Sequence, residues 1–176
     1  MKHHLRFWIP VYPDIKKPIG GVKQLHRVCE ILNSLNYQCT LVQDDPLFHP
    51  GWFESNVQTV SKYKWFNKIS LKKDTDIIIL PETFLAGVDS IFPTIKKIIF
   101  NQNAAYTFGL PNTKKYLSYQ QTIELYASSQ ILQVWTVSLH DRKFISSALR
   151  FPASRLHLIA NGLDYSHHFS HNIPKE

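Results

Sequence analysis

The chain has 176 residues, of which 44% are hydrophobic and 19% are charged, and these proportions exclude a disordered polypeptide. Its length is that of one domain with a substantial core. The formal net charge of +7 favours attraction to phosphates, nucleotides or an anionic membrane surface, or else serves solubility alone.

The first part of the chain alternates between strand and helix patterns. An apolar, aromatic-rich run at 5–12 predicts a strand, and a loop with Pro and Gly follows it. Apolar residues then recur with helical spacing over 22–35, which predicts a helix with one buried stripe, ending near Asn36. Residues 38–43 are the second predicted strand, whereas 53–73 permit no clear assignment.

The second part continues the alternation. Residues 76–80 are a continuous β-branched run, which predicts a strand buried on both faces. Further strands are predicted at 96–103, at 130–138 with a helix reaching Leu149, and at 155–160. Such alternation predicts a single doubly wound, Rossmann-like α/β domain with a mainly parallel sheet. Ligands bind such sheets outside the carboxyl ends of the strands.

Two features near the first helix are candidate ligand contacts. Gly20 and Gly21 let the backbone approach a ligand closely at a helix N-terminus, which suits phosphate, or they only permit a tight entry into the helix. Asp44 stands 23 positions after Gly21, where a dinucleotide-binding fold places its ribose carboxylate. The spacing G-x-G-x-x-G is missing, so a solvated turn is the favoured interpretation of Asp44.

Polar side chains also follow the later strands. The Glu82 carboxylate suits hydrogen bonds to sugar hydroxyls or proton transfer, or else stabilises the next helical turn. Three consecutive amides and Tyr106 suit a polyhydroxylated ligand, or form a polar turn followed by a buried ring. His140 is a candidate phosphate contact, near Ser138, which we predict to cap a helix. The candidates for an acceptor cleft are Glu82, Asn101, Gln102, Asn103, Tyr106 and His140.

The metal-ligating residue types indicate no metal site. Cys29 and Cys39 stand among apolar residues and are predicted to be reduced core thiols. Three histidines gather in the tail, where loose surface residues are expected, at His167, His168 and His171. We expect neither a metal nor a cofactor.

Membrane and targeting signals are weak in this sequence. No apolar run approaches the roughly 20 residues of a membrane span. The first residues lack the apolar core and cleavage site of a signal peptide. We therefore expect a cytoplasmic protein, with peripheral contact to the inner membrane surface as an extension suggested by the charge.

Three segments resemble a known family in the order in which they occur. The segment PIGGVKQLHRVCEILNSLNYQCTLV at 18–42 resembles the first loop and helix of retaining glycosyltransferases of the GT-B fold (glycosyl transferases group 1, family 4-like). VWTVSLHDRKFISSAL at 134–149 resembles a later strand and helix of that family. RLHLIANGLDYSHHF at 155–169 resembles the segment at which its chains cross between domains.

The resemblance implies a domain organisation. Members of this family have two Rossmann-like domains across a cleft: the amino-terminal one receives the acceptor, and the carboxyl-terminal one holds a nucleotide sugar with a Glu-x7-Glu motif. Residues 1–164 would then be the acceptor-side domain, and 165–176 the start of an interdomain linker or a disordered tail. The donor-binding domain is absent from this sequence.

The resemblance also assigns residues. Gly20 and Gly21 match the loop that lies against the donor's diphosphate, and Asn161, Gly162 and Asp164 match the interdomain hinge. Many relatives carry a histidine-containing motif where this chain has NQNAAYTF at 101–108. The catalytic residue therefore stays unassigned.

The function implied is that of the acceptor-side half of a glycosyltransferase. The whole enzyme would transfer a sugar from a nucleotide sugar, its substrate, to an acceptor hydroxyl, and this half alone would be inactive. The expected partners are a sugar or lipid-linked acceptor and a donor-binding domain or subunit, but no nucleic acid. Two alternatives stay open: a non-catalytic partner subunit that recruits a donor-binding chain, and a dinucleotide-binding Rossmann domain.

Overall fold

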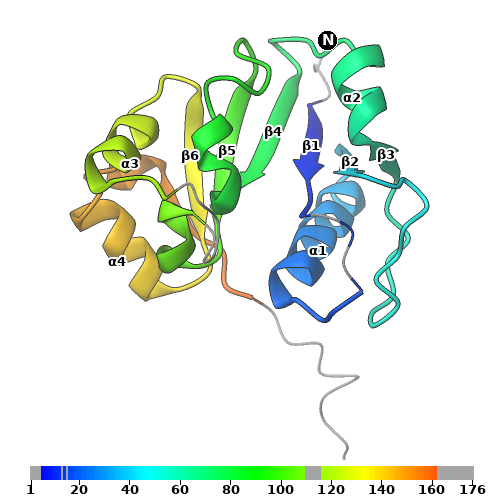
Figure 1. Cartoon of the computed structure of the whole chain (residues 1–176), viewed down its shortest axis with the longest axis horizontal. Helices are drawn as coiled ribbons and strands as arrows, with labels where there is room; N and C mark the ends of the chain where they lie inside the picture. The colour runs from blue at the N-terminus through cyan, green and yellow to red at the C-terminus, as the bar shows by residue number, and fades with distance from the viewer. Residues whose placement is uncertain (1–4, 13, 15, 110–115, 162–176) are drawn as a thin grey trace, which may run out of the picture.

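A computed structural model describes residues 5–12, 14, 16–109 and 116–161. Within them, a seven-stranded parallel sheet has the order β3-β2-β1-β4-β5-β6-β7 (Figure 1). The strands are β1 (Arg6–Pro10), β2 (Gln38–Gln43), β3 (Thr59–Ser61), β4 (Asp76–Pro81), β5 (Lys96–Asn101), β6 (Ile131–Thr136) and β7 (Leu156–Leu158). The helices are α1 (Gly20–Ser34), α2 (Lys62–Lys68), α3 (Tyr119–Tyr126) and α4 (Leu139–Ser147). Short 3-10 turns are η1 (Glu82–Gly87), η2 (Ala104–Phe108) and η3 (Ala153–Arg155).

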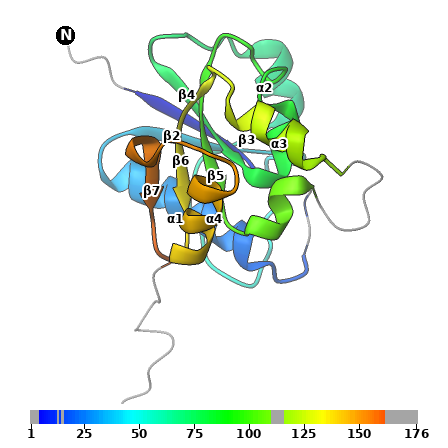
Figure 2. The same ribbon diagram turned by 90° about the vertical axis from the view of Figure 1, so that its left-hand side faces the viewer.

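The sheet grows outward from β1 in two directions, toward β2 and β3 on one side and toward β4 to β7 on the other. The helices lie on both of its faces: α1 is on one side, and α2 and α3 are on the other (Figure 2). This arrangement confirms the prediction of a single doubly wound, Rossmann-like α/β domain. Every strand pair in the described sheet is parallel, so the expectation of a mainly parallel sheet is confirmed as well.

Two apolar clusters fill the space between the sheet and its helices. On one face, Leu25 and Cys29 of α1 pack with Ile9 of β1 and Leu41 of β2. On the other face, residues of α2, η1, α3 and α4 pack on the same strands, among them the fully buried Trp65. The predicted thiols Cys29 and Cys39 are both buried and free, as expected for reduced cysteines.

The predicted helix over 22–35 is observed two residues earlier at its start, at Gly20, and it ends at Ser34. Asn36 follows with a φ of +63°, a left-handed conformation that asparagine tolerates better than most residues and that commonly ends a helix. The strand at 38–43 is observed with the predicted bounds. The strand predicted at 96–103 ends at Asn101, because the chain turns there into η2.

In two regions the sequence did not predict the helices and strands that the structure contains. The unassigned segment 53–73 contains β3, which has only three residues, and α2, which is capped by Ser61. The helix α3 was missed because it buries only Thr122 and Tyr126 and so lacks an apolar stripe. Its capping box, Ser118 with Gln121, was the available signal.

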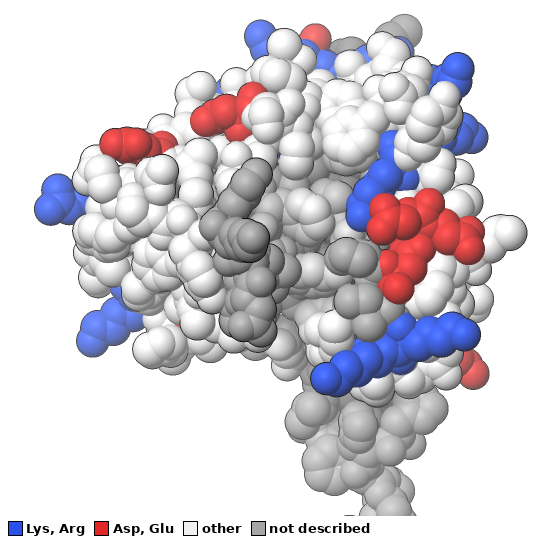
Figure 3. All heavy atoms as spheres, viewed as in Figure 1, with Lys and Arg blue, Asp and Glu red and all other residues white. Residues whose placement is uncertain are grey.

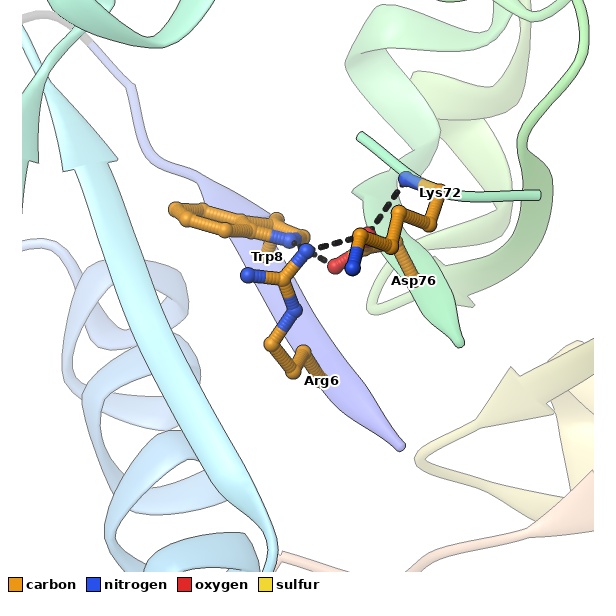
Figure 4. A network of polar contacts seen from close by, with 4 residues as sticks. All are labelled: Arg6, Trp8, Lys72 and Asp76. Carbon is orange, nitrogen blue, oxygen red and sulfur yellow. Dashed lines mark hydrogen bonds and ion pairs between the residues drawn. The ribbon is translucent and has the colours of Figure 1, made fainter. Parts of the chain in front are cut away.

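A buried carboxylate joins β1 to β4 near the amino ends of the two strands. Asp76 is 1% exposed. Its Oδ2 accepts hydrogen bonds from Arg6 Nη2 at 2.6 Å and from the backbone N–H of Lys72 at 2.6 Å, and its Oδ1 accepts one from Trp8 Nε1 at 2.8 Å (Figure 4). Three donors compensate the lost hydration of this carboxylate, so the network stabilises the pairing of the two central strands.

We predict that Asp76→Ala lowers the free energy of unfolding by about 2–4 kcal/mol, because the Trp8 and Lys72 donors lose their acceptor and the Arg6 guanidinium loses its counter-charge. Urea denaturation followed by circular dichroism measures the change. Asp74→Ala is the matched control, since Asp74 is an exposed carboxylate two positions away. Equal losses in the two variants would contradict a special role for the Asp76 network.

Candidate functional site

A cavity of about 510 Å³ lies where the sheet order reverses, beyond the carboxyl ends of β1, β4 and β5. This is the position at which open parallel sheets bind their ligands. The size is within the range of small-molecule sites. The lining residues are Tyr12, Ile19, Gly20, Gly21, Gln24, Glu82, Gln102, Asn103, Tyr106 and Asn161.

The cavity brings together many of the sequence candidates from four separate segments. These are Gly20, Gly21, Glu82, Gln102, Asn103, Tyr106 and Asn161. Two candidates do not line it: Asn101 is buried beneath the loop, and His140 is exposed on α4. The other two hinge candidates, Gly162 and Asp164, lie outside the described residues, as do the three histidines of the tail.

The glycine pair forms the first turn of α1. Ile19, at the N-cap position, supplies no capping side chain, and the first turn has no acidic residue. The N–H of Val22 bonds to the Ile19 carbonyl at 2.9 Å, whereas the N–H groups of Gly20 and Gly21 have no such bond among the described residues. These two are available to a ligand, and the helix dipole favours an anion.

The backbone itself does not require glycine at these positions. Neither Gly20 nor Gly21 has a positive φ. A Cβ added to Gly20 would meet nothing within 4 Å, and one on Gly21 would lie 3.3 Å from Oε1 of the Gln102 side chain. The absence of side chains therefore leaves the backbone of α1 accessible from the cavity.

Glu82 is the most unusual group in the cavity. It follows β4 directly, opens η1 and is 1% exposed, yet neither carboxylate oxygen has a hydrogen-bond partner among the described residues. Burial raises the pKa of Glu82 to about 7, and the negative charge of Asp141 adds to the rise. The backbone amides of Gln102 and Asn103 oppose it, although neither reaches the carboxylate with the geometry of a full hydrogen bond.

A carboxyl group with this pKa exchanges its proton near neutral pH. When protonated it donates a hydrogen bond, and when ionised it accepts bonds from hydroxyl groups. The carboxyl group has no hydrogen-bond partner among the described residues, so a ligand hydroxyl would supply the missing bond. This property distinguishes Glu82 from Asp76, which three protein donors satisfy.

The three consecutive amides have three different environments. Asn101 Nδ2 donates to Thr107 Oγ1 at 2.7 Å and to the Tyr126 hydroxyl at 3.1 Å. It therefore joins the end of β5 to η2 and α3. The exposed Asn103 caps η2 through its Oδ1, which accepts the Ala105 N–H at 2.9 Å. Gln102 lines the cavity beside Gly21.

Helix α4 supports the turn η2, whose Tyr106 lines the cavity. Ser138 caps α4 by accepting the N–H of Asp141 at 3.0 Å, as its sequence position predicted. The Ser138 hydroxyl also donates to Asp141 Oδ2 at 2.7 Å. Asp141 Oδ1 in turn accepts the N–H of Ala104 at 3.0 Å, which ties α4 to the start of η2.

Sequence reasoning missed three lining residues, Tyr12, Ile19 and Gln24. Tyr12 was taken only as the end of a strand; burial, followed by the charge of Glu82, raises the pKa of its phenol above the ordinary value. Gln24 lies one turn after the glycine pair, away from the buried residues of α1. The signal for Gln24 was its spacing of three and four residues from Gly21 and Gly20, which places all three on one side of the helix.

Asp44, the residue on which dinucleotide binding would depend, does not line this cavity. Its side chain is 53% exposed and pairs with Lys62 Nζ at 2.9 Å. The adjoining backbone is held by Asp14, whose Oδ2 accepts the N–H of Asp45 at 2.6 Å. The segment after β2 is therefore a solvated turn that is held by Lys62 and Asp14.

Within 5–12, 14, 16–109 and 116–161, no three His, Cys, Asp or Glu side chains gather to hold a metal ion. No helix in this part of the chain is long and apolar enough to cross a membrane. On the face seen in Figure 3, Lys and Arg stand at several separate places, some of them beside a cluster of Asp and Glu, and do not form one patch.

The chain matches no protein-family model and no curated protein sequence.

We predict that the stability difference between wild type and Glu82→Gln depends on pH. The folded carboxyl keeps its proton up to a pKa of about 7, against 4.5 for an ordinary glutamate, so the wild type loses stability as pH rises through this window. The glutamine variant has no such loss. Relative to wild type it should gain free energy of unfolding, of the order of 3 kcal/mol at most, between the two pKa values.

Urea denaturation of both proteins at a series of pH values measures this gain. Glu54→Gln, at an exposed position outside the cavity, is the control and should leave the pH profile of the wild type unchanged. A constant difference between wild type and Glu82→Gln at every pH would show that Glu82 ionises normally in the folded protein.

Proposed function

We propose that this chain is the acceptor-side half of a GT-B glycosyltransferase, which holds an acceptor hydroxyl while a separate donor-binding domain or subunit presents a nucleotide sugar. The support comes from a sequence resemblance over three segments, a doubly wound sheet, and a cavity at its switch point. The cavity lining is rich in amide and phenol groups, which suit a polyhydroxylated acceptor.

The observation that carries the proposal is the Glu82 carboxyl. It is buried, lines the cavity and has no partner among the described residues, and its pKa is raised to about 7. An acceptor hydroxyl that donates to Glu82 would satisfy the carboxylate and be oriented by it. In this account Glu82 positions the hydroxyl and accepts its hydrogen bond as the sugar is transferred.

The first turn of α1 provides the complementary property. The N–H groups of Gly20 and Gly21 and the helix dipole would stabilise the negative charge that develops on the diphosphate when its bond to the sugar breaks. Gly20 and Gly21 allow that diphosphate to approach the backbone. The bond from sugar to diphosphate breaks, a bond from sugar to acceptor oxygen forms, and the hydroxyl proton leaves toward the diphosphate or Glu82.

The purified chain should bind acceptors without consuming donors. Methyl glycosides of glucose, galactose and mannose are titrated into the ¹⁵N-labelled chain, and we expect at least one to shift the amides of Gly21, Asn103 and Tyr106. Nucleotide release from a panel of UDP- and GDP-sugars should stay at background. Rapid release by the purified chain would overturn the half-enzyme proposal, and absence of any glycoside shift would overturn the acceptor role.

Two observations separate the rival functions. A non-catalytic partner subunit would bind the acceptor or a membrane and associate with a donor-binding chain, but that chain would transfer sugar at the same rate without it. A dinucleotide-binding domain would respond to NAD and not to glycosides. Asp44, the carboxylate that a dinucleotide-binding fold would use for the ribose, is exposed, pairs with Lys62 and does not line the cavity.

We predict opposite effects on stability and binding for Gly21→Ala. Alanine has the higher helix propensity and Gln102 can move aside, so the free energy of unfolding should rise by about 0.5–1 kcal/mol. The added methyl group narrows the cavity beside the backbone, so glycoside affinity should fall, and it should fall further in Gly21→Val. Ser34→Ala, at the far end of α1, is the control for helix propensity alone.

Denaturation and the glycoside titration together read out both effects. If Gly21→Ala left the glycoside affinity unchanged, the glycine pair would serve only to begin α1 and would have no role in binding. This would hold even if the predicted gain in stability were observed.

A further inference from the structure

A second cavity, of about 790 Å³, lies between the outer side of α1 and the segment 52–57, which precedes β3. It shares no lining residue with the cavity around Glu82. Figure 1 shows this segment, in cyan, beside α1 on the β2 and β3 side of the sheet. The lining residues are Lys23, Arg27, Glu30, Asn33, Trp52, Phe53, Glu54, Ser55, Asn56 and Val57.

One wall of this cavity is aromatic. Trp52 is partly exposed, whereas its Nε1 is buried and has no partner among the described residues. The part of the indole that reaches the surface is therefore ring carbon. The C–H groups of a sugar ring pack on such a surface, because the face of an aromatic ring is electron-rich.

The aromatic wall is held in place by its neighbours. The rings of Trp52 and Phe53 meet edge to face with centroids 4.7 Å apart, and Phe53 meets His26 in the same way at 4.9 Å. His26 is buried, and its Nδ1 lies 2.8 Å from Ser55 Oγ. Burial lowers the pKa of His26 to about 4, so the ring is neutral at physiological pH and adds no charge. A wall fixed in this way loses little entropy on binding a ligand.

The polar rim has no net charge. Lys23, Arg27 and Glu30 come from successive turns of α1, and Glu54 comes from the facing loop. Arg27 Nη1 donates to Glu30 Oε2 at 2.6 Å, so these two charges compensate each other. Two cations and two carboxylates favour neither an anionic nor a cationic ligand. Together with the amide of Asn56, they offer both donors and acceptors to hydroxyl groups.

We propose that this second cavity binds an uncharged oligosaccharide, with one sugar ring packed on Trp52 and its hydroxyls bonded to the polar rim. A carbon surface beside balanced donors and acceptors matches the two faces of a sugar ring, which are apolar in the middle and polar at the edge. The volume exceeds that of the cavity around Glu82 and is within the range of ligand sites. The inference depends on its own residues and does not rest on the proposed glycosyltransferase function.

The test is an NMR titration of the ¹⁵N-labelled chain with maltopentaose, cellopentaose, chitopentaose and mannopentaose. At least one should shift the amides of 52–57 and the Trp52 indole N–H in a saturable manner. Trp52→Ala should weaken that binding about tenfold or more, because truncating an aromatic anchor removes much of a site's binding energy. Tyr63→Ala removes an aromatic ring that is 68% exposed outside this cavity and should leave the affinity unchanged.

A second variant tests the site even if Trp52→Ala does not fold. Glu54 and Asn56 are exposed, so Glu54→Ala with Asn56→Ala removes rim groups without disturbing the aromatic wall, and it should also weaken binding severalfold. Three results would overturn the inference: no shift at 52–57 with any oligosaccharide, shifts confined to Gly21, Asn103 and Tyr106, or equally tight binding of inorganic pyrophosphate at 52–57. The second of these would leave the proposed acceptor site intact, so the two proposals fail separately.

Discussion

The parallel pairing of β1 with both β2 and β4 is the constraint on which the rest of the structure depends. From β1 the chain first returns through α1 on one face to reach β2, and later crosses to β4 on the other side of β1. Because β2 and β4 lie on opposite sides of β1, the strand order reverses there, and a crevice lies beyond the carboxyl ends of β1, β4 and β5. The start of α1 and the residues after β4 and β5 meet in that crevice.

A buried carboxylate lies at each end of β4, and the two differ in their hydrogen-bond partners. At the amino end, Asp76 is surrounded by three donors, and its charge stabilises the sheet (Figure 4). At the carboxyl end of the same strand, Glu82 is equally buried and has no partner among the described residues. The fold does not need the second carboxylate, which costs stability when ionised. Its position in the cavity is the observation on which the proposed acceptor role depends.

The sequence predicted the fold class because its strands are continuous apolar runs and α1 has a strong apolar stripe. It predicted most of the cavity because the carboxyl ends of parallel strands lie at one edge of a sheet. Glu82, Gln102 and Asn103 follow such strands, so their proximity could be predicted before any contact was known. It could not separate Asn101 from its two neighbours, because the inward turn of that side chain depends on Thr107 and Tyr126. The cavity at Trp52 was missed, because its residues 52–57 fall in a part of the chain without periodicity. The contacts of Trp52 and Phe53 with each other and with His26 depend on the folded structure.

The most direct measurement is the pKa of Glu82 itself, followed by the ¹³Cδ chemical shift with and without a bound glycoside. The account predicts a free value of about 7. It also predicts a lower value in the complex, because a hydroxyl that donates to the carboxylate favours the ionised form. A free pKa at the ordinary value of 4.5, or a bound glycoside that leaves the Glu82 titration unmoved, would contradict the claim that this carboxyl meets the acceptor.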